Sequence, residues 1–257
     1  MLDQNARDNN KLFNKVVFMK NNKLVIGLLA LAAFSSSAAY ASSTTISTKY
    51  EQTFRESQDF KVKFGVGHVF DNDIGIAFEH QRRWRDEVSG RPELAENLFG
   101  FGYTYSLDED NRWSIQPKIE YKFNPGSETM RPMVRLNYRV NDDWRVGARY
   151  RYEYQTFSEG GGDRSRINRI DGYIGYALTD QIGLAWNSSY AYVLGDTGSM
   201  YTGSSDRWEH EFGAAYRVNS ANTLAVTYKR KDETREGASF NAGEHNDAVQ
   251  LTYSYRF

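Results

Sequence analysis

The chain has 257 residues, a formal net charge of −1, no cysteine and 15% aromatic residues, and its mean hydropathy of −0.69 is low. This hydropathy excludes a bundle of membrane-spanning helices but allows a membrane β-barrel, whose apolar signal per strand is weak. The absence of cysteine excludes disulfides and thiolate metal sites.

The N-terminal segment has the features of a secretory signal peptide. A basic stretch precedes an apolar run over residues 24–34, and small residues follow up to Ala41. The run is shorter than the roughly 20 apolar residues that a membrane helix needs, and a small-x-small site follows it. We therefore predict a cleaved signal over residues 1–41, with Met19 as an alternative start, and a mature domain over residues 42–257.

Apolar and polar residues alternate through Trp144–Phe157, which is the clearest strand of the chain. Alternate positions from Trp144 to Tyr154 are apolar or aromatic, and the positions between them carry three arginines and Glu153. A period of two predicts an extended strand with one apolar and one charged face. A one-residue shift would turn the arginines toward lipid, at about 2–4 kcal/mol for a basic residue at the midplane.

The same alternation continues to the last residue and predicts twelve strands. They are expected over Ile46–Arg55, Phe60–Phe70, Ile74–Arg85, Asn97–Leu107, Arg112–Phe123, Thr129–Val140, Trp144–Phe157, Arg169–Leu178, Ile182–Leu194, Arg207–Val218, Thr223–Lys231 and Asp247–Phe257. The eighth of these shows the alternation least clearly. Short turns rich in Asn and Asp alternate with longer connections, as in outer-membrane barrels. The predicted fold is an all-β, antiparallel, up-and-down transmembrane β-barrel.

The strands of a soluble β-sandwich would also show alternating apolar and polar residues, but two observations argue against this fold. The apolar phase carries more large side chains than one sandwich interior can hold, while all strands keep a polar opposite face. The chain also ends in an alternating strand with an aromatic last residue. We expect Tyr253, Tyr255 and Phe257 to form the signal read by the barrel-assembly machinery.

The polar phase carries about three times as many basic as acidic residues. A cationic wall in a narrow tube attracts anions, and the guanidinium fork binds carboxylates bidentately, which favours sugar acids. The candidate substrate-binding residues are Arg131, Arg135, Arg139, Arg145, Arg149, Arg151, Lys49, Arg55, Lys61, Lys63, Arg83, Lys118, Arg207, Arg217 and Arg256. The candidate lumen acids are Glu51, Glu120, Glu153, Glu209 and Glu211. Ion pairing that holds the barrel open is the alternative role for these groups, and both roles are compatible.

Other functions receive less support from the sequence. A barrel-embedded phospholipase or protease would use its histidines, but His68, His80, His210 and His245 show no catalytic spacing. A general anion or nucleoside channel stays open, although only Phe157 and Tyr173 among the aromatics fall on the polar phase. Nucleic-acid binding is disfavoured because the aromatics lie opposite the arginines. We expect no enzymatic activity, no cofactor and no metal.

Three segments resemble a known family. The Arg-Tyr-Arg-Tyr-Glu-Tyr core of Trp144–Phe157, the stretch Arg135–Arg139 and the ending Leu251–Phe257 are similar to the oligogalacturonate-specific porin (KdgM) family, which includes a sialic-acid porin. The resemblance implies a monomeric twelve-stranded porin in the Gram-negative outer membrane, surrounded by lipid and lipopolysaccharide. It also implies two facing basic tracks that pass acidic oligosaccharides. Pectin, alginate and sialic-acid fragments all remain open as substrates.

Overall fold

The computed structural model describes residues 41–54, 60–84, 94–158, 164–197, 206–233 and 245–257. The chain separates into two compact units, Met1–Ala41 and Ser42–Phe257. This boundary coincides with the one predicted for the signal peptide, whose cleavage remains a prediction. The predicted residue Arg55 lies outside the described residues.

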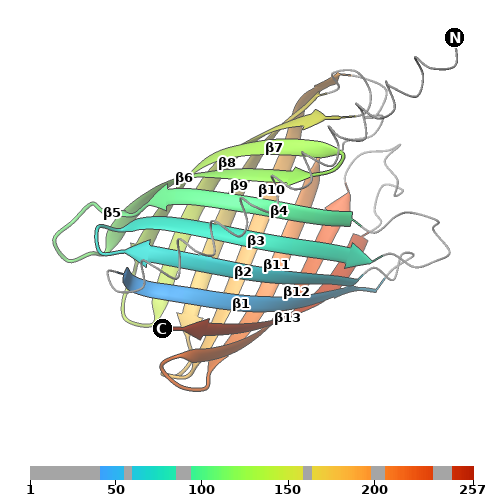
Figure 1. Ribbon diagram of the computed structural model, residues 1–257. Helices are drawn as coiled ribbons and strands as arrows, with labels where there is room; N and C mark the ends of the chain where they lie inside the picture. The colour runs from blue at the N-terminus through green and yellow to red at the C-terminus, as the bar shows by residue number, and fades with distance from the viewer. Residues whose placement is uncertain (1–40, 55–59, 85–93, 159–163, 198–205, 234–244) are drawn as a thin grey trace, which may run out of the picture. The chain divides into compact units, whose positions relative to one another are not determined.

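The second unit is a single antiparallel sheet of strands (Figure 1). The strands are β1 (Ala41–Thr53), β2 (Phe60–Phe70), β3 (Ile74–Trp84), β4 (Leu94–Tyr103), β5 (Tyr105–Ser106), β6 (Trp113–Asn124), β7 (Ser127–Arg139), β8 (Trp144–Phe157), β9 (Arg164–Ala177), β10 (Ile182–Thr197), β11 (Arg207–Arg217), β12 (Asn222–Glu233) and β13 (His245–Arg256). β4 and β5 both pair with β6 and are one strand interrupted at Thr104. The twelve-stranded barrel predicted from the sequence is therefore confirmed.

The sheet closes because the first and last strands pair with each other. β1 runs antiparallel to β13, with Tyr50 opposite Leu251. At the end of this pair, Thr44 and Phe257 exchange two backbone hydrogen bonds of 3.0 Å. The remaining strands pair with their neighbours in the chain, so the barrel has the simplest up-and-down order. A closed sheet leaves no unpaired strand edge in the membrane.

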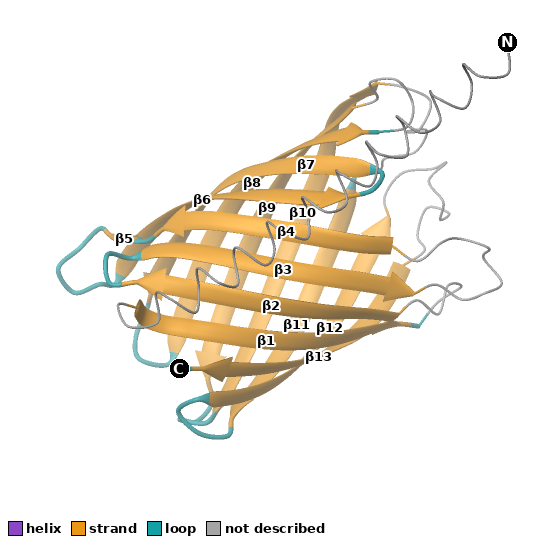
Figure 2. Ribbon diagram, in the orientation of Figure 1, coloured by secondary structure: helices purple, strands orange, loops and turns teal. Residues whose placement is uncertain are grey.

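Short polar turns connect the strands at the end of the barrel where the C-terminus lies (Figure 2). Asn141 accepts backbone hydrogen bonds from Asp143 and Trp144 at 3.0 and 2.7 Å, and Asn219 makes the equivalent pair of bonds in its own turn. Asp73 and Asn111 adopt positive φ angles of 62° and 53°. Asn and Asp tolerate this left-handed conformation, which explains their enrichment at these turns.

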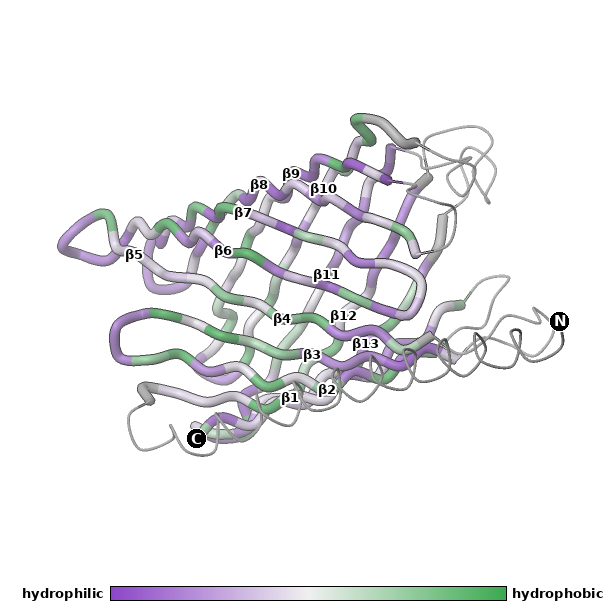
Figure 3. Tube along the Cα trace, turned by 45° about the horizontal axis from the view of Figure 1, so that its top comes forward, coloured by the Kyte–Doolittle hydropathy of each residue, from purple (hydrophilic) through white to green (hydrophobic). Residues whose placement is uncertain are grey.

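Large apolar side chains on one phase of the strands are exposed, and hydropathy alternates along the strands (Figure 3). Next to the short turns, Trp113 stacks on Tyr138 with ring centroids 4.3 Å apart, and Trp144 contacts Tyr176 at 4.5 Å. Each of these pairs joins register partners on adjacent strands. Such aromatic pairs are typical of the girdle that a membrane barrel places at the lipid–water interface.

The first and eighth strands differ most from their predicted bounds, and β1 begins at Ala41, five residues before the expected start at Ile46. β9 begins at Arg164, five residues before the expected start at Arg169. Its alternation is hard to read because Asn168 and Gly172 interrupt the apolar phase, while Ile167 lies buried on the other phase. Hydrogen bonding to both neighbouring strands defines this element more strongly than its own sequence does. Among the described residues, no helix is both long and apolar enough to cross a membrane.

Candidate functional site

The phase opposite the exposed apolar side chains is called here the charged phase. Its basic residues within the described strands are Lys49, Lys61, Lys63, Arg83, Lys118, Lys122, Arg131, Arg135, Arg139, Arg145, Arg149, Arg151, Arg169, Arg207, Arg217, Lys229, Lys231 and Arg256. The acidic residues on this phase whose side chains the structure describes are Glu51, Glu79, Glu96, Glu120, Glu153, Asp171, Glu209 and Glu211. Among the described side chains, basic ones therefore outnumber acidic ones by more than two to one.

Glu51 on β1 is the centre of one ion-pair cluster. Its carboxylate is 2.6 Å from Lys61 Nζ, 2.9 Å from Lys229 Nζ and 3.9 Å from Lys63 Nζ. Lys229 lies on β12, so its side chain reaches Glu51 over the intervening β13. Lys229 Nζ also lies 3.7 Å from Glu211, so three ammonium groups share two carboxylates and the cluster keeps a net positive charge.

Asp171 on β9 is the centre of a second cluster. It is fully buried, and its two carboxylate oxygens accept hydrogen bonds of 2.8 Å from Arg149 Nε and Arg169 Nε. Arg169 also pairs with Glu209, which in turn accepts a hydrogen bond of 3.1 Å from Arg207 Nε. The chain of alternating charges crosses β8, β9 and β11 and fixes the direction of each guanidinium group.

Further carboxylates on the charged phase pair with cations on their own strand or on nearby strands. Glu153 is 2.6 Å from Arg151 Nη2 and 3.2 Å from Arg131 Nε. Lys118 pairs with Glu120 at 2.8 Å. The remaining pairs are Lys122 with Glu96 at 3.0 Å and Lys49 with Glu79 at 2.6 Å.

A different set of arginines on the charged phase makes no ion pair with any carboxylate in the described part of the chain. Its members, called here the unpaired arginines, are Arg135, Arg139, Arg145, Arg217 and Arg256. Arg139 and Arg145 flank the short turn between β7 and β8, Arg217 precedes another short turn, and Arg256 is the penultimate residue. The unpaired arginines are thus concentrated toward the short-turn end of the barrel.

Two cavities lie against the unpaired arginines. One of about 540 Å³ is bordered by Arg135, Arg139, Arg145, Tyr173 and Asn187. A second cavity of about 360 Å³ is bordered by Arg217 and Arg256. Each cavity therefore brings guanidinium groups from two different strands to the same open space.

Tyr173 is an aromatic side chain on the charged phase, as the sequence predicted. Its ring centroid is 4.1 Å from Arg135 Cζ and 5.4 Å from Arg149 Cζ. Its hydroxyl oxygen and Arg135 Nε are both buried, and neither has a hydrogen-bond partner among the described residues. Arg135 is thus positioned by a π-face rather than by a carboxylate, whereas Arg149 contacts the ring and also binds Asp171.

The predicted basic residues fall into separate environments. Arg131, Arg149, Arg151, Arg207 and the predicted lysines form ion pairs, whereas the unpaired arginines do not. Arg83 lies opposite Lys61 in the β2–β3 register. Sequence reasoning omitted Arg169, Asp171 and Lys229, although they occupy the same phase. The weak alternation of β9 hid Arg169 and Asp171. Lys229 lay inside a predicted strand but was not chosen as a candidate binding residue.

Three histidines lie on the apolar phase and pair with short polar side chains. His210 Nδ1 is 3.0 Å from Ser188 Oγ, His80 Nδ1 is 2.8 Å from Asn97 Oδ1, and His68 Nδ1 is 2.8 Å from Thr44 Oγ1. The sequence did not reveal the Ser188–His210 contact because it depends on the β10–β11 register. Within the described residues, no carboxylate bonds to His210, and no group of His, Asp and Glu could hold a metal ion.

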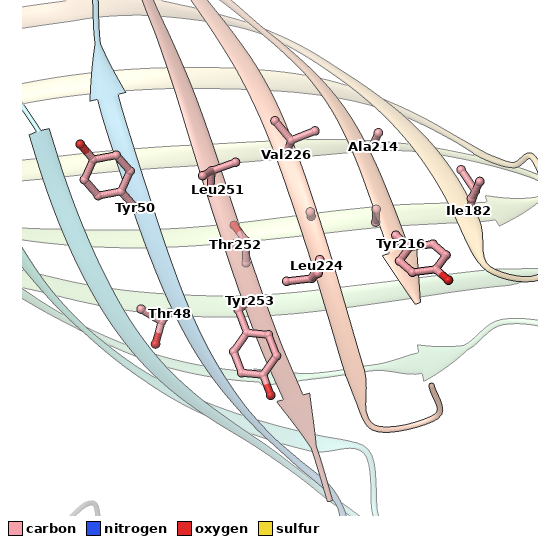
Figure 4. Close-up of a pocket in the computed structure, with 12 residues that line it drawn as sticks. Thr48, Tyr50, Ile182, Ala214, Tyr216, Leu224, Val226, Leu251, Thr252 and Tyr253 are labelled. Atoms are coloured by element: carbon pink, nitrogen blue, oxygen red, sulfur yellow. The ribbon is translucent and has the colours of Figure 1, made fainter. Parts of the chain in front are cut away.

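A groove of about 600 Å³ lies on the apolar phase of β1 and β10–β13 (Figure 4). Tyr50, Leu224, Val226 and Leu251 are among the side chains that border it. It contains none of the charged clusters and is a depression in the apolar surface.

Comparisons with known proteins identify the family. The family model described as "Oligogalacturonate-specific porin protein (KdgM)" matches residues 35–230. The uncharacterized protein YiiY of Salmonella typhimurium is 28% identical over 158 residues, which are 60% of this chain and 67% of YiiY. The N-acetylneuraminic acid outer membrane channel protein NanC of Escherichia coli K12 is 24% identical over 176 residues, covering 66% of this chain and 72% of NanC.

Solved structures share the fold. The NanC porin aligns with a TM-score of 0.65 and 18% identity, over 82% of this chain and 98% of that one. The KdgM porin in complex with disordered oligogalacturonate aligns with a TM-score of 0.60 and 17% identity, over 83% of this chain and 99% of that one. Together with the family match, they make the chain an outer-membrane β-barrel porin. It belongs to the oligogalacturonate-specific porin (KdgM) family.

Proposed function

We propose that the charged phase lines a water-filled pore through which acidic oligosaccharides of the oligogalacturonate type diffuse. The observation that carries this proposal is the excess of arginine on that phase, above all the unpaired arginines beside two cavities. Guanidinium groups without a protein carboxylate are available to a carboxylate on a passing sugar.

Contacts that span an intervening strand support the assignment of the charged phase to the lumen. Lys229 reaches Glu51 over β13, and Arg169 reaches Glu209 over β10. Strands in a sheet are about 4.8 Å apart, so these backbones are separated by about 10 Å. Side chains two strands apart converge on the concave side of a curved sheet and diverge on the convex side. The apolar phase then faces lipid, where exposed aromatic and aliphatic side chains are favourable.

The paired and unpaired cations have different roles in this proposal. Ion pairs such as Arg149–Asp171 fix the wall and reduce the local charge. The unpaired arginines supply the attraction, because their charge is not neutralised by a neighbouring carboxylate. Several similar sites of modest affinity meet the requirement of conduction that a substrate be attracted without being trapped.

The names of two relatives indicate a shared chemistry of the substrate. One solved relative is in complex with oligogalacturonate, and another relative is an N-acetylneuraminic acid channel. Both ligands are sugars with carboxylates, and the planar guanidinium fork matches the carboxylate geometry. A general anion channel is the second candidate, since the same cationic wall would also attract small inorganic anions.

Planar-bilayer recordings and liposome swelling test the proposal together. The wild-type pore should be anion-selective, and R139Q/R145Q should lower its anion-to-cation permeability ratio severalfold. The control K122Q/E96Q removes an ion pair without changing the net charge, so its selectivity should stay close to that of the wild type. Trigalacturonate should swell liposomes faster than a neutral trisaccharide. Cation selectivity would overturn the proposed lining, whereas anion selectivity without preference for trigalacturonate would favour the general anion channel.

A further inference from the structure

Two arginines on the apolar phase, Arg164 and Arg166, stand apart from the charged phase. Both lie at the start of β9, and both side chains are exposed. Arg166 is the register partner of Tyr154, whose phase is that of the exposed aromatics on β8. Because a basic side chain at the bilayer midplane costs about 2–4 kcal/mol, this pair must lie where the lipid headgroups begin.

Other charged side chains on the apolar phase have partners that neutralise or hold them. Arg230 pairs with Asp232 at 2.8 Å, and Asp206 accepts hydrogen bonds from Tyr190 Oη and from the backbone nitrogen of Val193 at 3.3 and 3.0 Å. In contrast, no carboxylate among the residues that the structure describes forms an ion pair with Arg164 or Arg166. Within the described ranges, two positive charges therefore lie together on this surface without a carboxylate partner.

A cluster of polar and aromatic side chains surrounds Asn168, which follows Arg166 by two residues on the same face of β9. Tyr150 donates a hydrogen bond of 2.6 Å to Asn168 Oδ1, and Asn168 Nδ2 donates one of 3.0 Å to the hydroxyl of Tyr192. Asn168 is only 6% exposed, so the cluster is packed rather than loose. Tyrosines with hydroxyls in a polar network and rings toward lipid mark the interfacial belt of a membrane protein. The two arginines lie immediately on the headgroup side of this belt.

The end of the barrel at which β9 begins determines which membrane leaflet the arginines meet. β9 starts at the end opposite the short turns and the C-terminus. Short turns of bacterial outer-membrane barrels are periplasmic, so Arg164 and Arg166 face the outer leaflet. We propose that they form a binding site for the phosphate groups of the anionic glycolipid in that leaflet, lipopolysaccharide.

The geometry suits a phosphate ligand. Residues two apart on a strand are separated by about 6.8 Å, so two long arginine side chains can converge on one phosphate or hold two neighbouring ones. Guanidinium forks bind phosphate oxygens bidentately, and such charge-assisted hydrogen bonds gain strength at the edge of the hydrocarbon region. This site uses the same assignment of faces as the proposed pore, but it is independent of the transported substrate.

Lipid-dependent stability provides the test. Purified protein in detergent is heated with added lipopolysaccharide, dephosphorylated lipopolysaccharide or inorganic phosphate, and the midpoint of its heat-induced gel shift is measured. Lipopolysaccharide should raise the midpoint of the wild type and of the control R230Q, whose arginine already has a carboxylate partner. In R164Q/R166Q the concentration needed for half of this protection should rise about tenfold or more. The single variant R166Q, measured in parallel, should show a smaller rise and serves if the double variant fails to assemble.

The other ligands distinguish the sources of phosphate. Dephosphorylated lipopolysaccharide should protect the wild type no better than it protects R164Q/R166Q. Equal protection of the wild type by phosphorylated and dephosphorylated lipid would overturn the site, as would an unchanged response in both arginine variants. Protection by inorganic phosphate as strong as that by lipopolysaccharide would overturn the assignment to the glycolipid. Since conductance plays no part in this assay, failure of the proposed pore function would be seen separately.

Discussion

Arg135 on β7 lies over the ring of Tyr173 on β9, with its Cζ 4.1 Å from the ring centroid and β8 between the two strands. Arg149 on β8 contacts the same ring at 5.4 Å. Of the two, Arg149 is also bound to Asp171, whereas Arg135 has no carboxylate partner among the described residues, and the ring holds it without neutralising its charge. In a wall where most other cations are held by carboxylates, Arg135 keeps positive charge available beside a cavity of about 540 Å³.

Replacing Tyr173 by alanine should weaken the binding of acidic oligosaccharide while making the pore wider. The cation–π contacts contribute about 0.5–2 kcal/mol, and without them the guanidinium group of Arg135 gains rotamer freedom, while Arg149 stays bound to Asp171. Single-channel recordings should show a higher conductance and weaker block by trigalacturonate. Tyr173→Phe keeps the ring and should behave like the wild type. Block that is unchanged in Tyr173→Ala would mean that the ring does not position the anion site.

Replacing Asp171 by asparagine should lower stability and raise anion selectivity in the same protein. Asp171 is fully buried and accepts hydrogen bonds from Arg149 and Arg169 at 2.8 Å. Loss of its charge weakens two charge-assisted hydrogen bonds, at about 1–3 kcal/mol in all, and leaves two cations in the wall with less compensation. Urea unfolding in detergent measures the first effect and reversal potentials measure the second. An increase in stability, or a shift toward cations, would contradict the ion-pair role.

The fold was predictable because a strand of a membrane barrel needs apolar side chains on its lipid-facing side and polar ones on the other, which makes the two kinds alternate along the sequence. Trp144–Phe157 coincides with β8 for this reason, and the Asn and Asp turns coincide with the short connections. β9 was misplaced at its start because Arg164, Arg166 and Asn168 lie where apolar residues were expected. The partners of Asn168, Tyr150 and Tyr192, come from neighbouring strands and cannot be read from β9 alone.

The candidate site was predictable in kind but not in arrangement. Alternation identified which arginines share a phase, yet it could not distinguish Arg149, which binds Asp171, from Arg145, which makes no ion pair with a carboxylate in the described part of the chain. That difference depends on the register between strands and on side chains that reach over a strand. The same limitation hid the contact between Ser188 and His210, which are 22 residues apart in the chain.

Anion selectivity should fall steeply as salt concentration rises. The Debye length is about 10 Å at 0.1 M and about 3 Å at 1 M, so guanidinium groups on the wall are screened from ions near the pore axis at high salt. Reversal potentials recorded with a fixed salt gradient ratio at both concentrations measure this effect. Selectivity that is independent of salt would indicate size exclusion rather than wall charge.

Replacing Ala148 by arginine should impair barrel assembly, because Ala148 lies on the apolar phase at the middle of β8. Its side chain is exposed, and its register partners are Leu136 and Gly172. A basic side chain facing the bilayer midplane costs about 2–4 kcal/mol, a large part of a typical stability of about 5–15 kcal/mol. Refolding into lipid vesicles, followed by the heat-induced gel shift, measures the folded fraction. The control Asn187→Arg places the same guanidinium on the charged phase, where Asn187 already bonds to Glu211 at 3.2 Å, and should assemble normally. If Ala148→Arg assembled as well as this control, the assignment of the two faces would be wrong.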